Sequence, residues 1–512
     1  MLVKKDNNIP NSEAVSNRKN TFYITTPIYY PNAKAHIGHA YTTIAADVLA
    51  RWFRLNGKEV EFLTGTDEHG QKIQTAAEQK GISPIEFTEP LVKEFKSLWK
   101  LLNISNNIFI RTTDKQHLDT IPKFVEKIKQ DIYKDKYEGW YCVPCESFFT
   151  ELQLEKGKCP DCNQEVKKVS EEAYFFKLSN YQKPLLEHYK NNPEFLSPKN
   201  KKQEIINRVK KGLKDLCITR ASVKWGTPYP YDKAHTLYVW VDALPNYITA
   251  LGYPEKKFKK FWPADIHLVG KEINWFHSVI WPALLLSAGI PLPKQVYAHG
   301  WWTVEGKKMS KSRGNVIDPV KVINEVGTDT FRYFLLREIA FGSDGDYSSA
   351  RLTQVNNSEL ANGLGNLVNR TLVMAEKYFG EVPDKKIDEA LAEKAIETVE
   401  KVSDSIEKLE FQQTLQAISA LVTDCNQYIN EKKPWELNDE SQRAKREQVI
   451  YTLLESLRFI STLYYPFMPE TSEKIFSSLG IKKQNLADLK TFGQLKPTTK
   501  IKKGEILFKK IE

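Results

Sequence analysis

Two short stretches of the chain carry side chains suited to phosphate chemistry. The first, His36-Ile37-Gly38-His39, places two imidazoles at i and i+3, on one side of a helical turn. Its glycine lets a base or a phosphate come close, and a helix N-terminus adds partial positive charge. The second, residues 305–315, holds four cations and two hydroxyls between two glycines. Taken alone, the two stretches are more typical of surface histidines and of a solvated basic loop.

Four of the six cysteines form two close pairs, Cys142 with Cys145 and Cys159 with Cys162, and 13 residues separate the pairs. Two C-x-x-C knuckles at this spacing can close a tetrahedral site of four thiolates. Such a site has no open position, so we expect one structural zinc ion; paired disulfides or free thiols are the alternatives. This use of cysteine points to a reducing compartment. The first 20 residues carry no targeting pattern, so we expect the cytoplasm, with an organellar address as the alternative.

The order of the predicted elements indicates the fold. Residues 21–27 form an apolar strand run, 36–55 an amphipathic helix and 60–64 a second strand. A strand–helix–strand order of this kind implies a parallel sheet with ligand sites where strands end. The alternation stops in a loop-rich block at about 134–256 that holds the cysteine pairs, and it returns with a strand at 266–270 and a helix at 274–288.

Beyond residue 350 the pattern becomes helical. Apolar residues recur at helical spacing around Leu360 and Leu364, and further helices are predicted at 390–409, 414–431 and 443–467. The expected fold class is α/β: a Rossmann-like parallel-sheet catalytic domain, split by a zinc-knuckle insertion and followed by an all-α C-terminal bundle.

The predicted domain boundaries follow from these changes in the sequence pattern. They are a flexible extension at 1–20, the first half of the catalytic domain at 21–133, the insertion at 134–256, the second half of the catalytic domain at 257–300, a region with the basic loop at 301–350 and a helical domain at 351–512. The first 20 residues lack the apolar core of a signal peptide.

Composition narrows the classes of partner. The 512 residues carry a net charge of +10 at pH 7, which favours a polyanion, with nucleic acid the first candidate. There is no run of 18 apolar residues, so we expect no membrane span. Neither G-x-G-x-x-G nor G-x-x-x-x-G-K-[ST] occurs, which removes support for ordinary dinucleotide and P-loop sites.

The two phosphate-binding stretches together resemble the signature pair of class I aminoacyl-tRNA synthetases, in the right order and about 270 residues apart. Further segments resemble the methionyl-tRNA synthetase family in particular, from about residue 21 to the end of the chain. They are Thr64–Gly70, Tyr238–Ala243, Gly270–His277, Phe341–Asp346 and Leu364–Arg370. The resemblance implies that methionine and ATP give methionyl-adenylate and pyrophosphate, and that the methionyl group then passes to the 3′ end of methionine tRNA.

The resemblance also implies roles for individual residues. The catalytic set would be His36, His39, Lys308 and Lys311, with Gly38 and Glu272 completing the ATP site and Mg²⁺ accompanying ATP. No covalent nucleophile is needed, because the amino acid carboxylate attacks the α-phosphate itself and the enzyme only positions groups and neutralises charge. Lys311 is the strongest single candidate. Arg220 matches an arginine near the family's site, without an assigned role.

By the same resemblance, a methionine pocket is expected. Asp67 would receive the α-ammonium group of the substrate, since a buried charge needs a partner. Aromatic surroundings suit a thioether sulfur. The remaining predicted pocket residues are Ile28, Tyr30, Trp240, Ala243, Leu244, Tyr247, Ile273, His277 and Trp281. Leu244 departs from the proline of some relatives, and without the resemblance these aromatic residues are more typical of a core.

In the helical bundle, Asn366 and Arg370 lie four residues apart on one predicted helix side, and Pro434-Trp435 ends a later helix. In the family the matching residues read the CAU anticodon: tryptophan stacks on an unpaired base, while arginine and asparagine bond to base edges. From the bundle sequence alone, a capping pair and a buried tryptophan are the more ordinary interpretation.

Two other functions stay open on the sequence. One is a class I synthetase for an aliphatic amino acid or cysteine, although the insertion is too short for a large editing domain. The other is a zinc- and tRNA-binding paralogue without catalysis. We expect a monomer, because the further C-terminal domain through which some relatives dimerise is not seen here.

Overall fold

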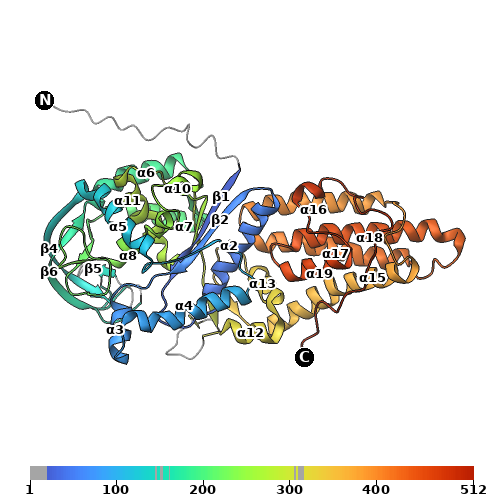
Figure 1. Cartoon of the computed structure of the whole chain (residues 1–512), viewed down its shortest axis with the longest axis horizontal. Coiled ribbons are helices and arrows are strands. Elements are labelled where there is room, and N and C mark those ends of the chain that lie inside the picture. The colour runs from blue at the N-terminus through green and yellow to red at the C-terminus, as the bar shows by residue number, and fades with distance from the viewer. Residues whose placement is uncertain (1–19, 144–146, 150–153, 161, 305–306, 309–315) are drawn as a thin grey trace. The chain divides into compact units, whose positions relative to one another are not determined.

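The computed structural model describes residues 20–143, 147–149, 154–160, 162–304, 307–308 and 316–512 (Figure 1). The chain forms two compact units, each described separately below. Unit 1 comprises Met1–Ala35, Val60–Ser97 and Asn106–His299, and unit 2 comprises His36–Glu59, Leu98–Ser105 and Gly300–Glu512. The boundaries of the domains predicted above differ from this division and stay a prediction.

Unit 1 is built on a six-stranded sheet in the order β3-β2-β1-β11-β12-β7. The registers described for β1–β11, β11–β12, β12–β7 and β2–β3 are all parallel, as the strand–helix–strand order predicts. The strands are β1 (Thr21–Tyr29), β2 (Glu59–Thr66), β3 (Ile108–Arg111), β7 (Leu196–Ser197), β11 (Ile266–Gly270) and β12 (Val296–His299). β11 is buried at every residue, as expected of a strand covered on both faces.

Helices follow the strands of this sheet. They are α3 (Gln71–Lys80), α4 (Pro84–Leu101, whose last turn belongs to unit 2), α5 (Lys115–Ile128), α6 (Gln182–Asn191), α7 (Lys199–Lys210), α8 (Val239–Ala243), α9 (Asn246–Thr249), α10 (Lys256–Phe261) and α11 (Trp281–Ala288). A 3-10 turn at Lys271–Ile273 and a π-helical turn at Phe276–Ile280 precede α11. One apolar cluster runs through unit 1 and includes Tyr23, Tyr247 and Trp281.

The block predicted as loop-rich contains a second sheet, so that expectation was wrong. β4 (Ile132–Cys142) pairs antiparallel with β6 (Lys167–Phe176) along almost its whole length, and β5 (Ser147–Phe149) and β8 (Leu216–Cys217) flank them. These strands are rich in charged residues, which hid them from an apolar pattern. The cross-strand ion pair of Lys134 with Glu172, at 2.9 Å, shows how charges are matched across the ladder. A short pair, β9 (Thr219–Arg220) and β10 (Thr236–Leu237), follows.

Unit 2 joins the long helix α2 (Ile37–Leu55) to the helical C-terminal half of the chain. A small sheet, in the order β14-β13-β15, consists of β14 (Lys307–Lys308), β13 (Trp302–Val304) and β15 (Gly345–Tyr347). The helices after it are α12 (Pro319–Val326), α13 (Thr328–Arg337), α14 (Ser349–Val355), α15 (Asn366–Tyr378), α16 (Glu389–Glu407), α17 (Phe411–Lys432), α18 (Arg443–Tyr464) and α19 (Pro469–Ser478). A π-helical stretch, Asn356–Gly365, connects α14 to α15.

The helical pattern beyond residue 350 is confirmed. Leu360, Leu364 and Leu367 are at most 1% exposed, and α16, α17 and α18 match the three predicted helices to within three residues at each end. The fold class is confirmed with them: a parallel α/β sheet and an all-α C-terminal bundle. Among the described residues, no helix is long and apolar enough to span a membrane.

Candidate functional site

His36 and His39 form the N-terminal cap of α2. The Nδ1 atom of His36 accepts a hydrogen bond from the amide of Gly38 at 3.1 Å, and Nδ1 of His39 accepts one from the amide of His36 at 3.1 Å. The two rings stack with centroids 3.9 Å apart. Because both Nδ1 atoms accept, a neutral ring carries its proton on Nε2. Each histidine can therefore donate an Nε2–H to an anion near the helix N-terminus.

Gly38 is required by the cap itself. A Cβ at this position would lie 3.0 Å from Cε1 and 3.1 Å from Nδ1 of the His36 ring. A larger residue would therefore press on the imidazole and require it to shift by a few tenths of an ångström. From the sequence, Gly38 was expected only to let a ligand come close; its contact with the His36 ring is a second reason for a glycine here.

The basic loop is only partly described. Lys307 and Lys308 form β14, where the backbone of Lys308 pairs with that of Thr303 in β13. Lys311 and the two serines of the loop lie outside the described residues, as does the side chain of Lys308. Beyond the loop, the carbonyl of Ile317 accepts a hydrogen bond from the amide of Ile37 at 3.4 Å. The chain that leaves the loop thus contacts the first residue of α2.

The predicted methionine-pocket residues come together in unit 1. Ile28, Tyr30, Trp240, Leu244, Tyr247, Ile273 and Trp281 belong to or pack against its apolar cluster. The ring of Trp240 stacks on Phe276 at 3.9 Å and meets the His277 ring edge to face at 6.1 Å. Ala243 is buried on the same short helix as Trp240. Phe276 was missed by the sequence interpretation, although it is next to His277.

Hydrogen bonds fix the protonation of His277. Its Nδ1 lies 3.0 Å from the carbonyl of Ile273, so Nδ1 carries the proton and Nε2 accepts from the hydroxyl of Tyr247 at 2.6 Å. Burial lowers the pKa of His277 to about 4, and the bond to Ile273 only partly opposes this. The imidazole is therefore neutral at physiological pH, so an apolar substrate side chain can pack against it without the cost of desolvating a charge.

A π-helical turn determines where His277 points. The predicted helix at 274–288 is helical throughout, but it contains this π turn, because Pro282 has no amide hydrogen to give the carbonyl of Ser278. The hydroxyl of Tyr189 donates to that carbonyl instead, at 2.6 Å. Such π turns are frequent at functional sites. Here the turn spans Phe276–Ile280 and carries His277.

Asp67 follows β2 and is 5% exposed, and its amide donates to the carbonyl of Tyr29 at 2.9 Å. Its Oδ1 atom accepts from the hydroxyl of Thr112 at 3.4 Å. A nearly buried carboxylate at the carboxyl end of a parallel strand has the chemistry to hold an ammonium group. The structure thus places Asp67 in unit 1, the unit that holds the aromatic cluster.

The sequence interpretation missed two charged pairs next to Asp67, each of which contains a buried carboxylate. Arg111 holds Glu68 through two hydrogen bonds, of 2.7 and 2.9 Å. Asp242 accepts a 2.6 Å hydrogen bond from Nδ1 of His69. Burial alone would raise the pKa of Asp242, but His69 outweighs this effect and holds the pKa below its usual range. Since 173 residues separate His69 from Asp242, no local spacing could have revealed the pair.

Glu272 folds back over the end of β11. A Cβ at Gly270 would lie 2.5 Å from a carboxylate oxygen of Glu272, so only glycine at 270 permits this position. Arg220 is 4% exposed, and its guanidinium lies 4.4 Å from the centre of the Tyr238 ring. Both residues belong to unit 1.

Three of the four predicted zinc ligands converge. The ligand atoms of Cys142, Cys159 and Cys162 lie within 4.8 Å of one another, and the Sγ atoms of Cys142 and Cys162 are 3.5 Å apart. Sulfurs that share a tetrahedral zinc ion are separated by about 3.8 Å, given Zn–S bonds of about 2.3 Å. Cys145 lies outside the described residues. The three thiols could hold a metal ion, and the donor set suits zinc.

The predicted anticodon residues lie in unit 2. Arg370 donates to Asn430 at 2.9 Å, and its guanidinium lies 5.5 Å from the ring centre of Trp435. Trp435 is 41% exposed, which excludes the interpretation as a buried tryptophan. Pro434 is buried just after α17, which ends at Lys432. An exposed indole beside a guanidinium is a suitable platform for an unpaired base.

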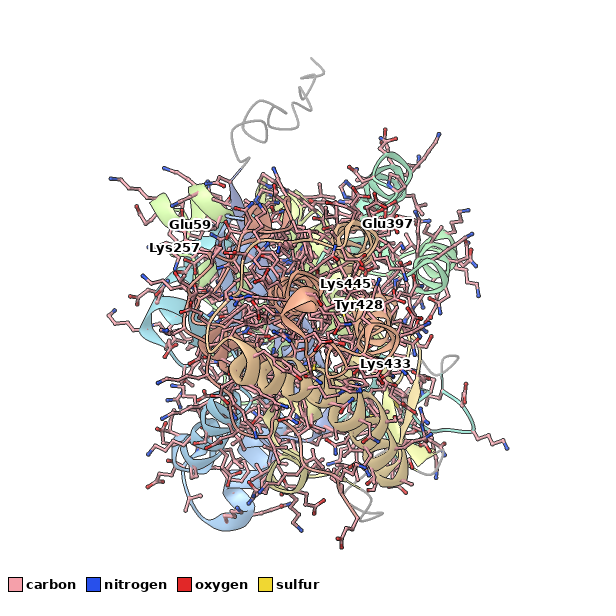
Figure 2. The ribbon with its side chains drawn as sticks, turned by 90° about the vertical axis from the view of Figure 1, so that its right-hand side faces the viewer. Glu59, Lys257, Glu397, Tyr428, Lys433 and Lys445 are labelled. Carbon is pink, nitrogen blue, oxygen red and sulfur yellow. The ribbon has the colours of Figure 1, made fainter. Side chains whose placement is uncertain are left out.

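Asn366 lies one turn before Arg370 and donates to Asn426 at 3.2 Å. It also lines a cavity of about 390 Å³, together with Asn362, Asn369, Lys474 and Lys503. Exposed lysines, among them Lys433 and Lys445, lie on the face of the bundle seen in Figure 2. Carboxamides and cations of this kind suit nucleic acid.

Two family models match the chain. The class I tRNA synthetases (M) match residues 22–171 and 163–372, and the anticodon-binding domain of tRNA ligases matches residues 388–509. Asn366 and Arg370 thus fall within the synthetase match, whereas Pro434 and Trp435 fall within the anticodon-binding match.

Curated relatives and solved structures agree with these matches. The chain is 53% identical to a methionine–tRNA ligase of Caldanaerobacter subterraneus subsp. tengcongensis, over 96% of this chain and 79% of that protein. It is 48% identical to a methionine–tRNA ligase of Thermotoga maritima, over 96% of this chain and 80% of that protein. The Mycobacterium tuberculosis methionyl-tRNA synthetase in complex with methionyl-adenylate superimposes with a TM-score of 0.92 at 40% identity, over 96% of this chain and 99% of that one. The chain therefore belongs to the methionyl-tRNA synthetases, class I aminoacyl-tRNA synthetases that use ATP to join methionine to its tRNA.

Proposed function

We propose that the residues described above divide the two steps of this reaction between them. In the first step a carboxylate oxygen of methionine forms a bond to the α-phosphorus of ATP, and the bond from that phosphorus to the bridging oxygen breaks. Pyrophosphate leaves with the electron pair. In the second step a hydroxyl of the terminal ribose of the tRNA attacks the carbonyl carbon of methionyl-adenylate, and AMP leaves. Neither step needs a covalent enzyme intermediate, so the side chains act by positioning and by charge.

The methionine substrate is assigned to the aromatic cluster of unit 1. Asp67 takes the α-ammonium group, while Trp240, Tyr247 and Trp281 surround the thioether. Ile28, Tyr30, Ala243, Leu244, Ile273 and His277 complete the proposed pocket. The neutral imidazole of His277, fixed by Tyr247 and Ile273, supports this assignment, because a charged group would disfavour a desolvated thioether.

The phosphates of ATP are assigned to His36, His39, Lys308 and Lys311. Nε2–H groups on both histidines can donate to the α-phosphate as negative charge grows on it, and the lysines neutralise the β- and γ-phosphates. Gly38 keeps the His36 ring in place, and Glu272 takes the ribose. Magnesium bound with ATP would neutralise further phosphate charge.

The cysteine cluster is proposed to hold one structural zinc ion, with Cys145 as fourth ligand beside Cys142, Cys159 and Cys162. The short separations between the three described sulfurs support zinc. Four thiolates leave no coordination position for a substrate, so the ion stabilises the insertion.

The anticodon of methionine tRNA is assigned to Asn366, Arg370, Pro434 and Trp435. The exposed indole next to Arg370 supports a stacked base there, with amide and guanidinium groups bonding to base edges. The cytoplasm is the proposed location, on the strength of the cysteine usage. A monomer stays a prediction, which sedimentation can test.

The observation that carries the proposed specificity is the cluster of Trp240, Tyr247 and Trp281 around neutral His277. ATP–pyrophosphate exchange, measured with each of the twenty amino acids, tests it. Methionine should support exchange at least about a hundredfold better than leucine, isoleucine or cysteine, because each mismatched side chain loses aromatic contact. Exchange that is strongest with another amino acid would refute the pocket assignment. Binding of tRNA without any exchange would indicate the non-catalytic paralogue.

A further inference from the structure

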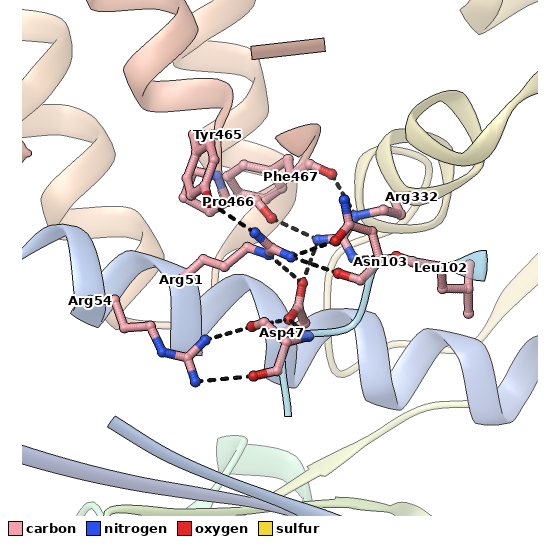
Figure 3. A network of polar contacts seen from close by, with 10 residues as sticks. Asp47, Arg51, Arg54, Leu102, Asn103, Arg332, Tyr465, Pro466 and Phe467 are labelled. Carbon is pink, nitrogen blue, oxygen red and sulfur yellow. Dashed lines mark hydrogen bonds and ion pairs between the residues drawn. The ribbon is translucent and has the colours of Figure 1, made fainter. Parts of the chain in front are cut away.

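A buried cluster of charges joins segments of unit 2 that are far apart in the sequence (Figure 3). Its members are Asp47 and Arg51 of α2 and Arg332 of α13, which are 0%, 7% and 0% exposed. None of the motifs discussed above includes these residues.

Arg332 holds three segments at once. Its Nη2 donates to Oδ2 of Asp47 at 2.8 Å and to the carbonyl of Pro466 at 2.8 Å. Its Nε donates to the carbonyl of Phe467 at 2.9 Å, and its Nη1 to that of Leu102 at 2.9 Å. The rigid, planar fork of a guanidinium is the group that can serve four acceptors in fixed directions. One side chain therefore ties α2 to the segment after α4 and to the turn between α18 and α19.

Asp47 is fully engaged by its neighbours. Oδ2 also accepts from Nε of Arg51 at 2.8 Å, and Oδ1 accepts from the amide and the hydroxyl of Ser105 at 2.7 and 2.6 Å. Burial alone would raise the pKa of Asp47, but Arg51 and then Arg332 lower this pKa to about 2. Arg51 in turn donates to the hydroxyl of Tyr465 at 3.1 Å and to the carbonyl of Asn103 at 2.6 Å.

Stability alone does not explain such a cluster. Apolar residues of similar volume commonly replace a buried ion pair at no loss of stability. What directional hydrogen bonds add is a fixed register between the segments that they join. Here that register is the position of α2 along its axis relative to α13 and to Pro466 and Phe467.

The position of α2 matters because its N-terminus carries His36 and His39. Asp47 lies 11 residues after His36, about 16 Å along a helix that rises about 1.5 Å per residue. A helix is stiff over this length, so a shift at Asp47 reaches the histidines almost undiminished. Misplacement of a reacting group by about 1 Å can reduce a rate about a hundredfold.

We propose that Arg332 is a positioning residue for adenylate formation: its hydrogen bonds to Asp47, Leu102, Pro466 and Phe467 set the axial position of α2 and thereby that of His36 and His39. The proposal rests on the phosphate-binding role proposed for those histidines. Arg332 itself contacts no substrate, since it is buried in the interior of unit 2. It acts on the rate of the chemical step and not on the binding of methionine, whose proposed ligands lie in unit 1.

The test compares Arg332→Lys with Arg458→Lys. Lysine keeps the charge of Arg332 but has no fork to reach four acceptors. Arg458 is a matched control. It is 1% exposed, pairs with Glu455 at 2.8 Å and donates to the carbonyls of Asp488 and Thr491, and none of these partners belongs to α2. Measured are the melting temperature, the active sites titrated by adenylate formation, the kcat of methionine-dependent pyrophosphate exchange per titrated site, and KM for methionine.

Arg332→Lys should lower kcat per titrated site by about ten- to a hundredfold, with KM for methionine changed less than twofold. Arg458→Lys should lower the melting temperature or the titrated fraction and leave kcat per site unchanged. An unchanged kcat per site in Arg332→Lys, or an equal fall in both variants, overturns the proposal.

A second variant decides the matter if Arg332→Lys does not fold. Asp47→Asn keeps the shape of the carboxylate that accepts from Nη2 of Arg332 but removes its charge, so kcat per site should fall about two- to fivefold. An unchanged value would overturn the proposal in that case. Wild-type enzyme and His36→Ser are measured in the same assay. If the proposed function itself were wrong, His36→Ser would retain wild-type exchange, which distinguishes that failure from failure of the positioning role.

Discussion

The proton positions of individual histidines follow from single hydrogen bonds. His36 and His39 accept backbone amides at Nδ1 and so carry a proton at Nε2, whereas His277 donates at Nδ1 and accepts at Nε2. The first two rings can thus donate to an anion, as proposed for the phosphates of ATP, and the third accepts from Tyr247. Residues of one type have different tasks because their backbone surroundings differ.

His36 has two roles that a substitution can separate. His36→Ser keeps a side-chain oxygen that can cap α2, so the free energy of unfolding should change by less than about 0.5 kcal/mol. The Nε2–H donor is lost, and kcat of pyrophosphate exchange should fall about a hundredfold. His36→Ala should lose the same activity and about 1 kcal/mol of stability in addition. Equal activity in His36→Ser and wild type, by exchange kinetics, would contradict the role in ATP binding.

The low pKa of His277 links stability to pH. The pKa of this imidazole is about 6.5 in the unfolded chain and about 4 in the folded chain. Between these values the unfolded chain binds a proton that the folded chain does not, so the free energy of unfolding falls as pH falls through this window. The full effect is up to about 3 kcal/mol.

In denaturant titrations between pH 7 and pH 5, His277→Gln should therefore show a shallower loss of stability than wild type. His267 is also buried and remains in both proteins; because His277 helps to lower the pKa of His267, His277→Gln removes that contribution as well, which adds to the difference between the two slopes. Identical pH slopes in the two proteins would mean that His277 is not a buried neutral group.

At the scale of elements, the sequence predicts most of the helices and strands but few of the buried ion pairs between them. The strand at 266–270 matches β11 to the residue, and the helices of the bundle are within three residues of their predicted ends. These elements were predictable because their apolar residues are buried and recur at the spacing of a helix or a strand. The β4–β6 ladder was missed because its strands are charged. The π turn before α11 was missed although Pro282 is visible in the sequence, because the hydrogen bond that compensates for the missing amide comes from Tyr189, which is 89 positions away from Ser278.

The candidate site divides in the same way. Short motifs identified His36, His39 and the cysteine knuckles, because their spacing is local and carries its own geometry. Resemblance alone suggested the aromatic cluster. The pairs Asp242–His69 and Asp47–Arg332 were not predicted at all, since 173 and 285 residues separate their members. Only the folded chain brings these charges together.

The zinc knuckle is an element that a metal should hold together. Cys145→Ser and Cys159→Ser should each lower zinc content from one toward zero per chain, measured by atomic emission, and lower the unfolding temperature of the insertion. Cys217→Ser is the matched control, since Cys217 is buried on β8 outside the cluster. Full zinc in Cys145→Ser would exclude it as the fourth ligand.

The segment just after α17 carries Trp435, the proposed stacking platform for the anticodon. Trp435→Ala should raise KM for methionine tRNA by about ten- to a hundredfold, because the stacking of one base contributes about 1–3 kcal/mol. Exchange without tRNA should stay normal. Tyr231→Ala, which removes an aromatic side chain that is also 41% exposed, should leave KM unchanged. If Trp435→Ala abolishes exchange as well, the tryptophan is structural.

Over the whole molecule, each unit has one part of the reaction assigned to it. Unit 1 holds Asp67, the aromatic cluster and the cysteine knuckle, while unit 2 holds the histidine pair, the basic loop and the anticodon residues. The net charge of +10 suits a partner with a phosphate backbone. The proposed activation of methionine therefore uses residues of both units, whereas the proposed recognition of the anticodon uses residues of unit 2.

Charging of tRNA tests the account most directly, because it requires both properties together. The wild-type chain should attach labelled methionine to a tRNA with the CAU anticodon in the presence of ATP. It should charge the same tRNA with an altered anticodon at least about a hundredfold less efficiently in kcat/KM, since each lost base contact contributes about 1–3 kcal/mol. Equal charging of the two tRNAs would contradict the anticodon assignment, and no charging of either would contradict the account as a whole.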